Sequence, residues 1–140
     1  MKPTVKYIHL RYAPDEGEND NAPFSNMGGA TLAYCFVESL KNDIVELRMA
    51  LTVCSKVDNF CKQEGRTRAT YRLEGHPNRW THTVELSPDE IVQLSTIEII
   101  QYAYEAWPRE LDTWGIDADF NLELLAAKEA KLGTATRVQI

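Results

Sequence analysis

The spacing of apolar residues along the chain predicts four strands and three helices. Apolar and β-branched residues gather in four short segments bounded by turn residues, and such segments are typical of strands. The expected strands are 5–12, 30–38, 44–53 and 79–86. Lys41, Asn42 and Asp43 between the second and third segments are turn residues. We therefore expect these two strands to pair as an antiparallel β-hairpin.

Apolar residues at helical spacing follow the hairpin and again the last strand. The expected helices are 56–73, 88–107 and 120–132. Ser55 with Asp58 three residues later resembles a capping box, with Asp in place of the usual Glu. Ser87, Pro88 and Glu90 supply an N-cap, a first-turn proline and a third-position carboxylate, which together indicate a helix start.

Hairpin, helix, strand and helix in this order predict an α+β fold: a mostly antiparallel sheet of about four strands with helices packed on one face. No internal repeat or change of composition divides 1–140, so we expect a single domain. It should include an acidic loop at 13–26 and a C-terminal helix and tail at 119–140. Open sheet edges and Tyr, Trp and Ile residues expected to be exposed on helix 88–107 favour a homodimer or larger closed homo-oligomer.

Composition and charge argue against several classes of protein and several kinds of partner. The chain has 140 residues, no apolar run of the ~20 residues that a membrane span needs, and no apolar core of a signal peptide at its start. Its three cysteines form no CxxC pair, so we expect no disulfide framework, no structural zinc and a reducing cytoplasm. The formal net charge of −6 disfavours long nucleic acids and acidic membrane surfaces as partners. No cofactor is expected.

Charge is distributed unevenly. Residues 56–82 hold six basic and three acidic side chains, a local charge of +3, whereas the rest of the chain holds 9 basic and 18 acidic side chains, a charge of −9. A basic segment in an acidic protein suits one small anion better than a long polyanion. A solvated, salt-bridged surface is the structural alternative.

The basic segment contains two arginines within the apolar stripe of the expected helix. Arg68 and Arg72 are spaced i, i+4, so their guanidinium groups are neighbours, whereas Arg66 projects to the opposite side. Such a pair needs counter-charge, and three sources stay open: Glu64 on the same helix, an acidic residue from elsewhere, or a bound phosphate. This placement requires one helix, so a strand anywhere in 58–70 would contradict it and any motif interpretation that relies on the helical spacing of the arginines.

The remaining candidates for a functional role are a glycine within the expected helix, one cysteine and three histidines. Gly65 costs about 1 kcal/mol relative to Ala in a helix, which is tolerated where a packed backbone or a ligand approaches closely. Cys54 before a helix would be either a thiol of lowered pKa or a core side chain. His9, His76 and His82 are scattered without metal-ligand spacing, and His82 is expected to be a core residue. We therefore expect a binding protein and not an enzyme.

Two runs of the sequence are similar to a pattern found in small phage proteins. Residues 54–73 match C-S-x-x-D-x-F followed after four residues by G-R-x-x-A-x-x-R-L, and residues 26–34 contain G-G-x-T-x-A-Y. The runs cover about a fifth of the chain and resemble the Thoeris anti-defence 1 family. Members of that family are phage sponges that capture a cyclic ADP-ribose-type immune signal and are not known to cleave it.

The resemblance implies a binding site for a small anionic cyclic nucleotide. It assigns the two phosphates to Arg66 and Arg72, which match the motif, while Arg68 lies outside it. Phe60 or Trp80 would form an aromatic wall for the adenine base.

The second run would complete this site. The resemblance implies that the Gly28 and Gly29 backbone N–H groups approach a phosphate or ribose and that Thr31 supplies a hydroxyl.

Two functions from different classes follow. In the first, the protein is a phage anti-defence sponge that sequesters a cyclic ADP-ribose-type or cyclic oligonucleotide signal in the cytoplasm of an infected bacterial cell. In the second, it is an acidic protein–protein inhibitor of a host nucleic-acid-binding or defence enzyme. The basic segment favours the first, and the charge of −9 in the rest of the chain favours the second.

Overall fold

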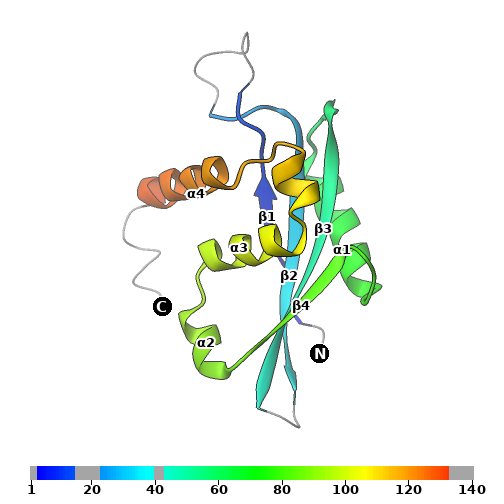
Figure 1. Ribbon diagram of the computed structural model, residues 1–140, viewed down its shortest axis with the longest axis vertical. Helices are drawn as coiled ribbons and strands as arrows, with labels where there is room; N and C mark the ends of the chain where they lie inside the picture. The colour runs from blue at the N-terminus through cyan, green and yellow to red at the C-terminus, as the bar shows by residue number, and fades with distance from the viewer. Residues whose placement is uncertain (1–2, 15–22, 40–42, 133–140) are drawn as a thin grey trace.

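The computed structural model describes residues 3–14, 23–39 and 43–132 and contains one four-stranded sheet (Figure 1). The strands are β1 (Lys6–Leu10), β2 (Met27–Ser39), β3 (Ile44–Asn59) and β4 (Thr81–Leu86). They lie in the order β1-β2-β3-β4, and every neighbouring pair is antiparallel. The helical elements are α1 (Lys62–Glu74), α2 (Pro88–Gln93), α3 (Thr96–Ala106), the π-helical turn η1 (Arg109–Thr113) and α4 (Ala118–Leu132). The expected α+β class with an antiparallel four-stranded sheet is confirmed.

Helices cover both faces of the sheet, which differs from the single covered face expected. Ala69 and Leu73 of α1 pack against Ala33, Cys35 and Ala50 on one face. The opposite face carries the larger core, to which β1, β2, β3, α3 and the segment after α3 all contribute. Both faces are covered because successive side chains of β2 and β3 point to opposite sides and are apolar on both.

The predicted hairpin is confirmed and is longer than expected. β2 and β3 pair from Ser39↔Ile44 at the turn to Gly29↔Cys54. Beyond a bulge between Met27 and Gly29, the pairing ends at Met27↔Asn59. The end of β3 is therefore held against the start of β2.

The predicted helix start at 56 is wrong. Residues 55–59 continue β3, and α1 begins at Lys62 after Cys61, which makes no side-chain capping hydrogen bond. Pairing with β2 outweighs the local capping signal of Ser55 and Asp58, and the Phe60 N–H donates to the Asn26 carbonyl at 2.9 Å. Strand structure at 58 and 59 contradicts the expectation of a single helix and counts against the motif interpretation that relied on it. All three candidate arginines nevertheless lie in α1, so their helical spacing is kept.

The segment expected as one helix over 88–107 consists of α2 and α3. The predicted capping box of Ser87 and Glu90 is present, and a second box, formed by Ser95 and Glu98, starts α3. A capping serine has a non-helical backbone, so the second box interrupts the helix at this point.

Exposure along α2, α3 and β4 also differs from expectation. Of the large apolar residues of 88–107, only Val92 and Ile97 are exposed, whereas Ile99, Ile100, Tyr104 and Trp107 are buried. His82 of β4 is exposed rather than a core residue. One argument for a homo-oligomer was an exposed face of aromatic residues on 88–107, and the structure does not provide that face. The homo-oligomer therefore stays a prediction.

The centre of the acidic loop (15–22), the hairpin turn (40–42) and the tail (133–140) lie outside the described residues. Within the described ranges, no helix has the length and apolar character needed to cross a bilayer.

Candidate functional site

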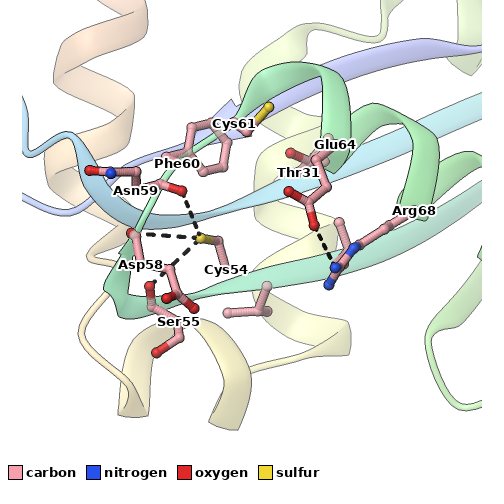
Figure 2. Close-up of a pocket in the computed structure, with 12 residues that line it drawn as sticks. Thr31, Cys54, Ser55, Asp58, Asn59, Phe60, Cys61, Glu64 and Arg68 are labelled. Carbon is pink, nitrogen blue, oxygen red and sulfur yellow. Dashed lines mark hydrogen bonds and ion pairs between the residues drawn. The ribbon is translucent and has the colours of Figure 1, made fainter.

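A cavity of ≈ 530 Å³ lies between the sheet and the first turns of α1 (Figure 2). β2 and β3 contribute its floor, and the segment that leads from β3 into α1 contributes its wall. The cavity is lined by Thr31, Thr52, Val53, Cys54, Ser55, Asp58, Asn59, Phe60, Cys61, Glu64, Gly65 and Arg68. Six of these, namely Thr31, Cys54, Ser55, Asp58, Phe60 and Gly65, occupy positions that the two motifs specify. The fold thus brings the two runs together around one space.

Gly65 allows α1 to lie directly on β2. A Cβ atom at this position would collide with the Thr31 hydroxyl oxygen, so no larger residue fits without movement of the helix or the strand. Thr31 is fully buried and shares a 3.0 Å hydrogen bond with His9 Nδ1. Of the two explanations for a glycine here, close packing of helix on sheet is the one that the contacts support.

Gly28 and Gly29 lie inside β2 rather than in a turn with free N–H groups. Both are buried, with φ of 70° and 142°. A Cβ on Gly28 would come within 2.7 Å of Lys56 Cα, and one on Gly29 within 2.6 Å of the Leu10 carbonyl. These glycines therefore serve close backbone packing at the bulge, which corrects their expected role as a phosphate-facing turn.

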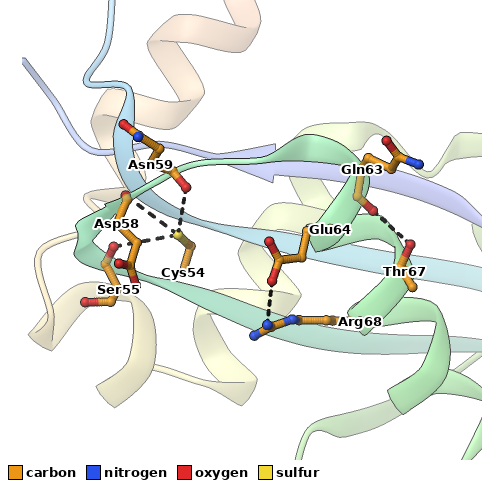
Figure 3. A network of polar contacts seen from close by, with 8 residues as sticks. All are labelled: Cys54, Ser55, Asp58, Asn59, Gln63, Glu64, Thr67 and Arg68. Carbon is orange, nitrogen blue, oxygen red and sulfur yellow. Dashed lines mark hydrogen bonds and ion pairs between the residues drawn. The ribbon is translucent and has the colours of Figure 1, made fainter.

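Cys54 does not have the properties of an activated nucleophile. Burial, helped by the negative charges of Asp58 and Glu64, raises the pKa of its thiol. The thiol lies 3.6 to 3.9 Å from the carbonyl oxygens of Ser55, Asp58 and Asn59 (Figure 3). The alternative of a lowered pKa at a helix start is wrong, because Cys54 lies in β3 and faces carbonyl groups.

Arg68 is neutralised on its own helix. Its guanidinium Nη2 lies 2.5 Å from Glu64 Oε1, and both side chains are more than half exposed (Figure 3). The i, i+4 salt bridge that the sequence allowed is therefore present for Arg68. An exposed pair of this kind contributes about 0.3–0.5 kcal/mol, so it does not prevent Glu64 and Arg68 from turning to a ligand.

Arg72 is placed differently. Its Nη1 donates a 2.6 Å hydrogen bond to the Leu51 carbonyl, and its guanidinium carbon lies 4.4 Å from the centre of the Trp80 ring. Arg79 lies at 4.9 Å from the same ring. Among the described residues, no carboxylate is within ion-pairing distance of Arg72 or Arg79. Burial, followed by the nearby charges of Arg68 and Arg79, lowers the pKa of Arg72.

A second cavity, of ≈ 420 Å³, adjoins Arg72 and the Trp80 ring. It shares Val53, Cys54 and Ser55 with the first cavity and is also lined by Tyr12, Lys56, Arg72, Trp80 and Trp114. Among the described residues, no carboxylate lines this cavity. The Arg72 guanidinium beside three aromatic rings is suited to an anionic ligand that carries a planar ring.

The candidate arginines therefore do not converge on one space. Arg68 lines the first cavity, Arg72 the second, and Arg66 a third of ≈ 470 Å³ on the outer side of α1 with Tyr7 and Tyr71. Arg66 points away from the other two because a rotation of about 100° per residue puts it on the other side of the helix. Arg68 and Arg72 lie on one face and separate because Arg72 is held by the Leu51 carbonyl and the Trp80 ring. A single ligand can therefore reach Arg68 and Arg72 together more readily than it can reach Arg66. Arg66 is nevertheless one of the two residues to which the resemblance assigns a phosphate.

Sequence reasoning missed Arg11. This side chain is 8% exposed, and its guanidinium carbon lies 4.3 Å from the Phe24 ring centre and 4.1 Å from that of Phe60. His9 meets Phe60 edge to face at 5.5 Å. Phe60 is thus partly occupied by the protein's own groups, and its role as a base wall is restricted to the side facing the first cavity. Arg79, Tyr12 and Trp114 were also missed, since only their tertiary placement sets them apart.

His9 should give the protein a defined acid sensitivity. Burial, with the charges of Lys62, Arg66, Arg11 and Lys128, lowers the pKa of His9 to about 4. Between the unfolded-state pKa of about 6.5 and pH 4, the unfolded chain binds a proton that the folded protein rejects. The contribution of His9 to stability is complete above about pH 6.5 and declines as the pH falls toward 4.

Urea unfolding at several pH values between 7 and 4 measures this effect. We expect His9→Gln to show a shallower loss of stability over this range than the parent protein. The exposed His82 supplies the matched control, and His82→Gln should keep the parent's pH profile. A His9→Gln profile as steep as the parent's would contradict the assignment.

Three comparisons with known proteins provide no relative. No protein-family model, no curated protein and no solved structure matches the chain. Within the described part of the chain, no group of three or more His, Cys, Asp and Glu residues is arranged to hold a metal ion.

Proposed function

We propose that the protein binds a small phosphate-bearing nucleotide and sequesters it without cleaving it. The observation that carries this proposal is the pair Arg72 and Arg79, which contact one Trp80 ring and have no carboxylate partner among the described residues. Arg72 and Trp80 line the second cavity. Two such cations repel each other, and a bound phosphate relieves the repulsion through charge-assisted hydrogen bonds.

The resemblance narrows the ligand to a cyclic ADP-ribose-type signal, with a cyclic oligonucleotide as the other member of the same class. Capture without chemistry agrees with the raised pKa of the Cys54 thiol, which disfavours covalent catalysis at that residue. On this proposal the protein acts in the cytoplasm of an infected bacterium as a phage anti-defence protein.

Isothermal titration calorimetry against cyclic ADP-ribose, its ring-linkage isomers and cyclic dinucleotides tests the proposal. We expect at least one member to bind at micromolar concentration or below and to be recovered chemically unchanged after the protein is denatured. Absence of binding across this panel, or recovery of a hydrolysed product, would contradict a sponge. It would then favour the alternative of an acidic protein–protein inhibitor.

A further inference from the structure

β3 continues past the end of β4 and leaves an open edge beside the second cavity. β4 pairs with β3 only as far as Thr81↔Ala50, and the Leu51 N–H then donates to the Trp80 carbonyl at 3.0 Å. The Leu51 carbonyl accepts a hydrogen bond from the Arg72 guanidinium. Leu51 is thus the last β3 residue whose backbone is paired on this edge among the described residues.

The next outward-facing backbone on this edge belongs to Val53. In a strand, the N–H and C=O of alternate residues point to the same edge, so Val53 repeats the direction of Leu51 two residues earlier. Its ladder partner on the other edge is β2, where Val53 lies opposite Ala30. Val53 lines both the first and the second cavity. An adjacent donor and acceptor therefore face the space that a longer β4 would occupy.

The walls of that space select a flat ring. Trp114 is 51% exposed and lines the second cavity, as do Tyr12 and Trp80. The Trp80 ring already contacts two guanidinium groups, so Trp114 offers the freer aromatic surface. A nucleobase presents a neighbouring acceptor and donor on one edge of a planar ring, and adenine does so with N7 or N1 beside its N6 amino group.

We propose that the open edge of β3 at Val53 binds the base of a purine nucleotide through the backbone, with the base against Trp114 and its phosphate at Arg72. This inference rests on the proposed function and adds to it the site at which the base of the nucleotide is bound. It predicts that the base contributes affinity beyond that of the phosphate, and that backbone groups rather than a polar side chain read it.

The test compares ADP with pyrophosphate, which has the phosphates but no base. We expect the parent protein to bind ADP at least about tenfold more tightly than pyrophosphate, because two hydrogen bonds and a ring stack are lost together. Exchange of N1 or N7 for carbon should weaken ADP binding about fivefold at one of these positions, whereas the 3-deaza analogue, altered on the far edge, should bind like ADP.

Val53→Pro tests the protein side. Proline is tolerated on an edge strand where its missing N–H faces outward, and it deletes the proposed donor. Val53→Ala also removes the branched valine side chain but keeps the N–H. We expect the proline variant to bind ADP about fivefold more weakly than the alanine variant, with pyrophosphate binding the same in both.

The outcomes are separable. ADP that binds no better than pyrophosphate, or full tolerance of both the 1-deaza and 7-deaza analogues, would overturn this inference and leave phosphate binding intact. If Val53→Pro weakens ADP and pyrophosphate equally, it has distorted the strand, and the deaza comparison then decides. Failure of the parent protein to bind pyrophosphate, ADP and the cyclic nucleotides would overturn the proposed function and this inference with it.

Discussion

Arg72→Ala is expected to reduce the affinity for the nucleotide ligand about 100-fold while the protein stays folded. A guanidinium that holds a phosphate through two charge-assisted hydrogen bonds contributes about 3 kcal/mol or more to binding. Within the described residues no carboxylate pairs with Arg72, so its removal leaves no buried anion behind. Its hydrogen bond to the Leu51 carbonyl and its contact with Trp80 should together contribute about 2 kcal/mol to stability.

Calorimetry and thermal unfolding on the same preparation measure both effects. Arg48→Gln is the matched control, because the Arg48 guanidinium lies in β3 and is already paired with Glu46 at 2.8 Å. It should keep full ligand affinity. Arg66→Ala tests whether Arg66 binds a phosphate, as the resemblance implies, or lies too far from the ligand, as the separate cavities indicate. A loss of affinity as large as that of Arg72→Ala would show that the ligand reaches the outer side of α1. A loss of several kcal/mol of stability in Arg72→Ala, with unchanged affinity, would identify Arg72 as a structural residue instead.

Gly65→Ala is expected to destabilise the protein by about 2 kcal/mol, although alanine is the better helix former. The gain in helix propensity is about 1 kcal/mol, and the collision of the new Cβ with the Thr31 hydroxyl should outweigh it, as overpacking costs about 1–3 kcal/mol and occasionally more. Thr31 is fully buried in β2 and cannot move aside without losing its hydrogen bond to His9.

Chemical denaturation of Gly65→Ala measures the loss, and Gly75→Ala provides the control. A Cβ on Gly75 meets its nearest atom at 3.6 Å, which is ordinary contact, so that variant should stay within about 0.5 kcal/mol of the parent. In the double variant with Thr31→Ala, the obstructing hydroxyl is gone. Its destabilisation should be at least about 1 kcal/mol smaller than the sum of the two single changes. A Gly65→Ala variant as stable as the parent would contradict the close packing of α1 on β2.

The candidate site was only partly predictable because its residues come from distant parts of the chain. The basic segment and Arg68–Arg72 spacing follow from the sequence, as does the choice between Glu64 and a ligand as counter-charge. The choice of ion-pair partner depends on side-chain placement in the folded protein. Glu64 forms its ion pair with Arg68, whereas Arg72 contacts the Trp80 ring.

The sequence by itself determined the α+β class, the antiparallel hairpin and the start of α2 at its capping box. These features depend on alternation, turn residues and caps within a few residues of one another. Only the tertiary structure decided where β3 gives way to α1, because the ladder with β2 extends to Met27↔Asn59 and overrides the Ser55 cap signal. The covering of both sheet faces and the meeting of Arg72 and Arg79 on Trp80 are also tertiary, since they depend on which strand lies beside which helix after folding.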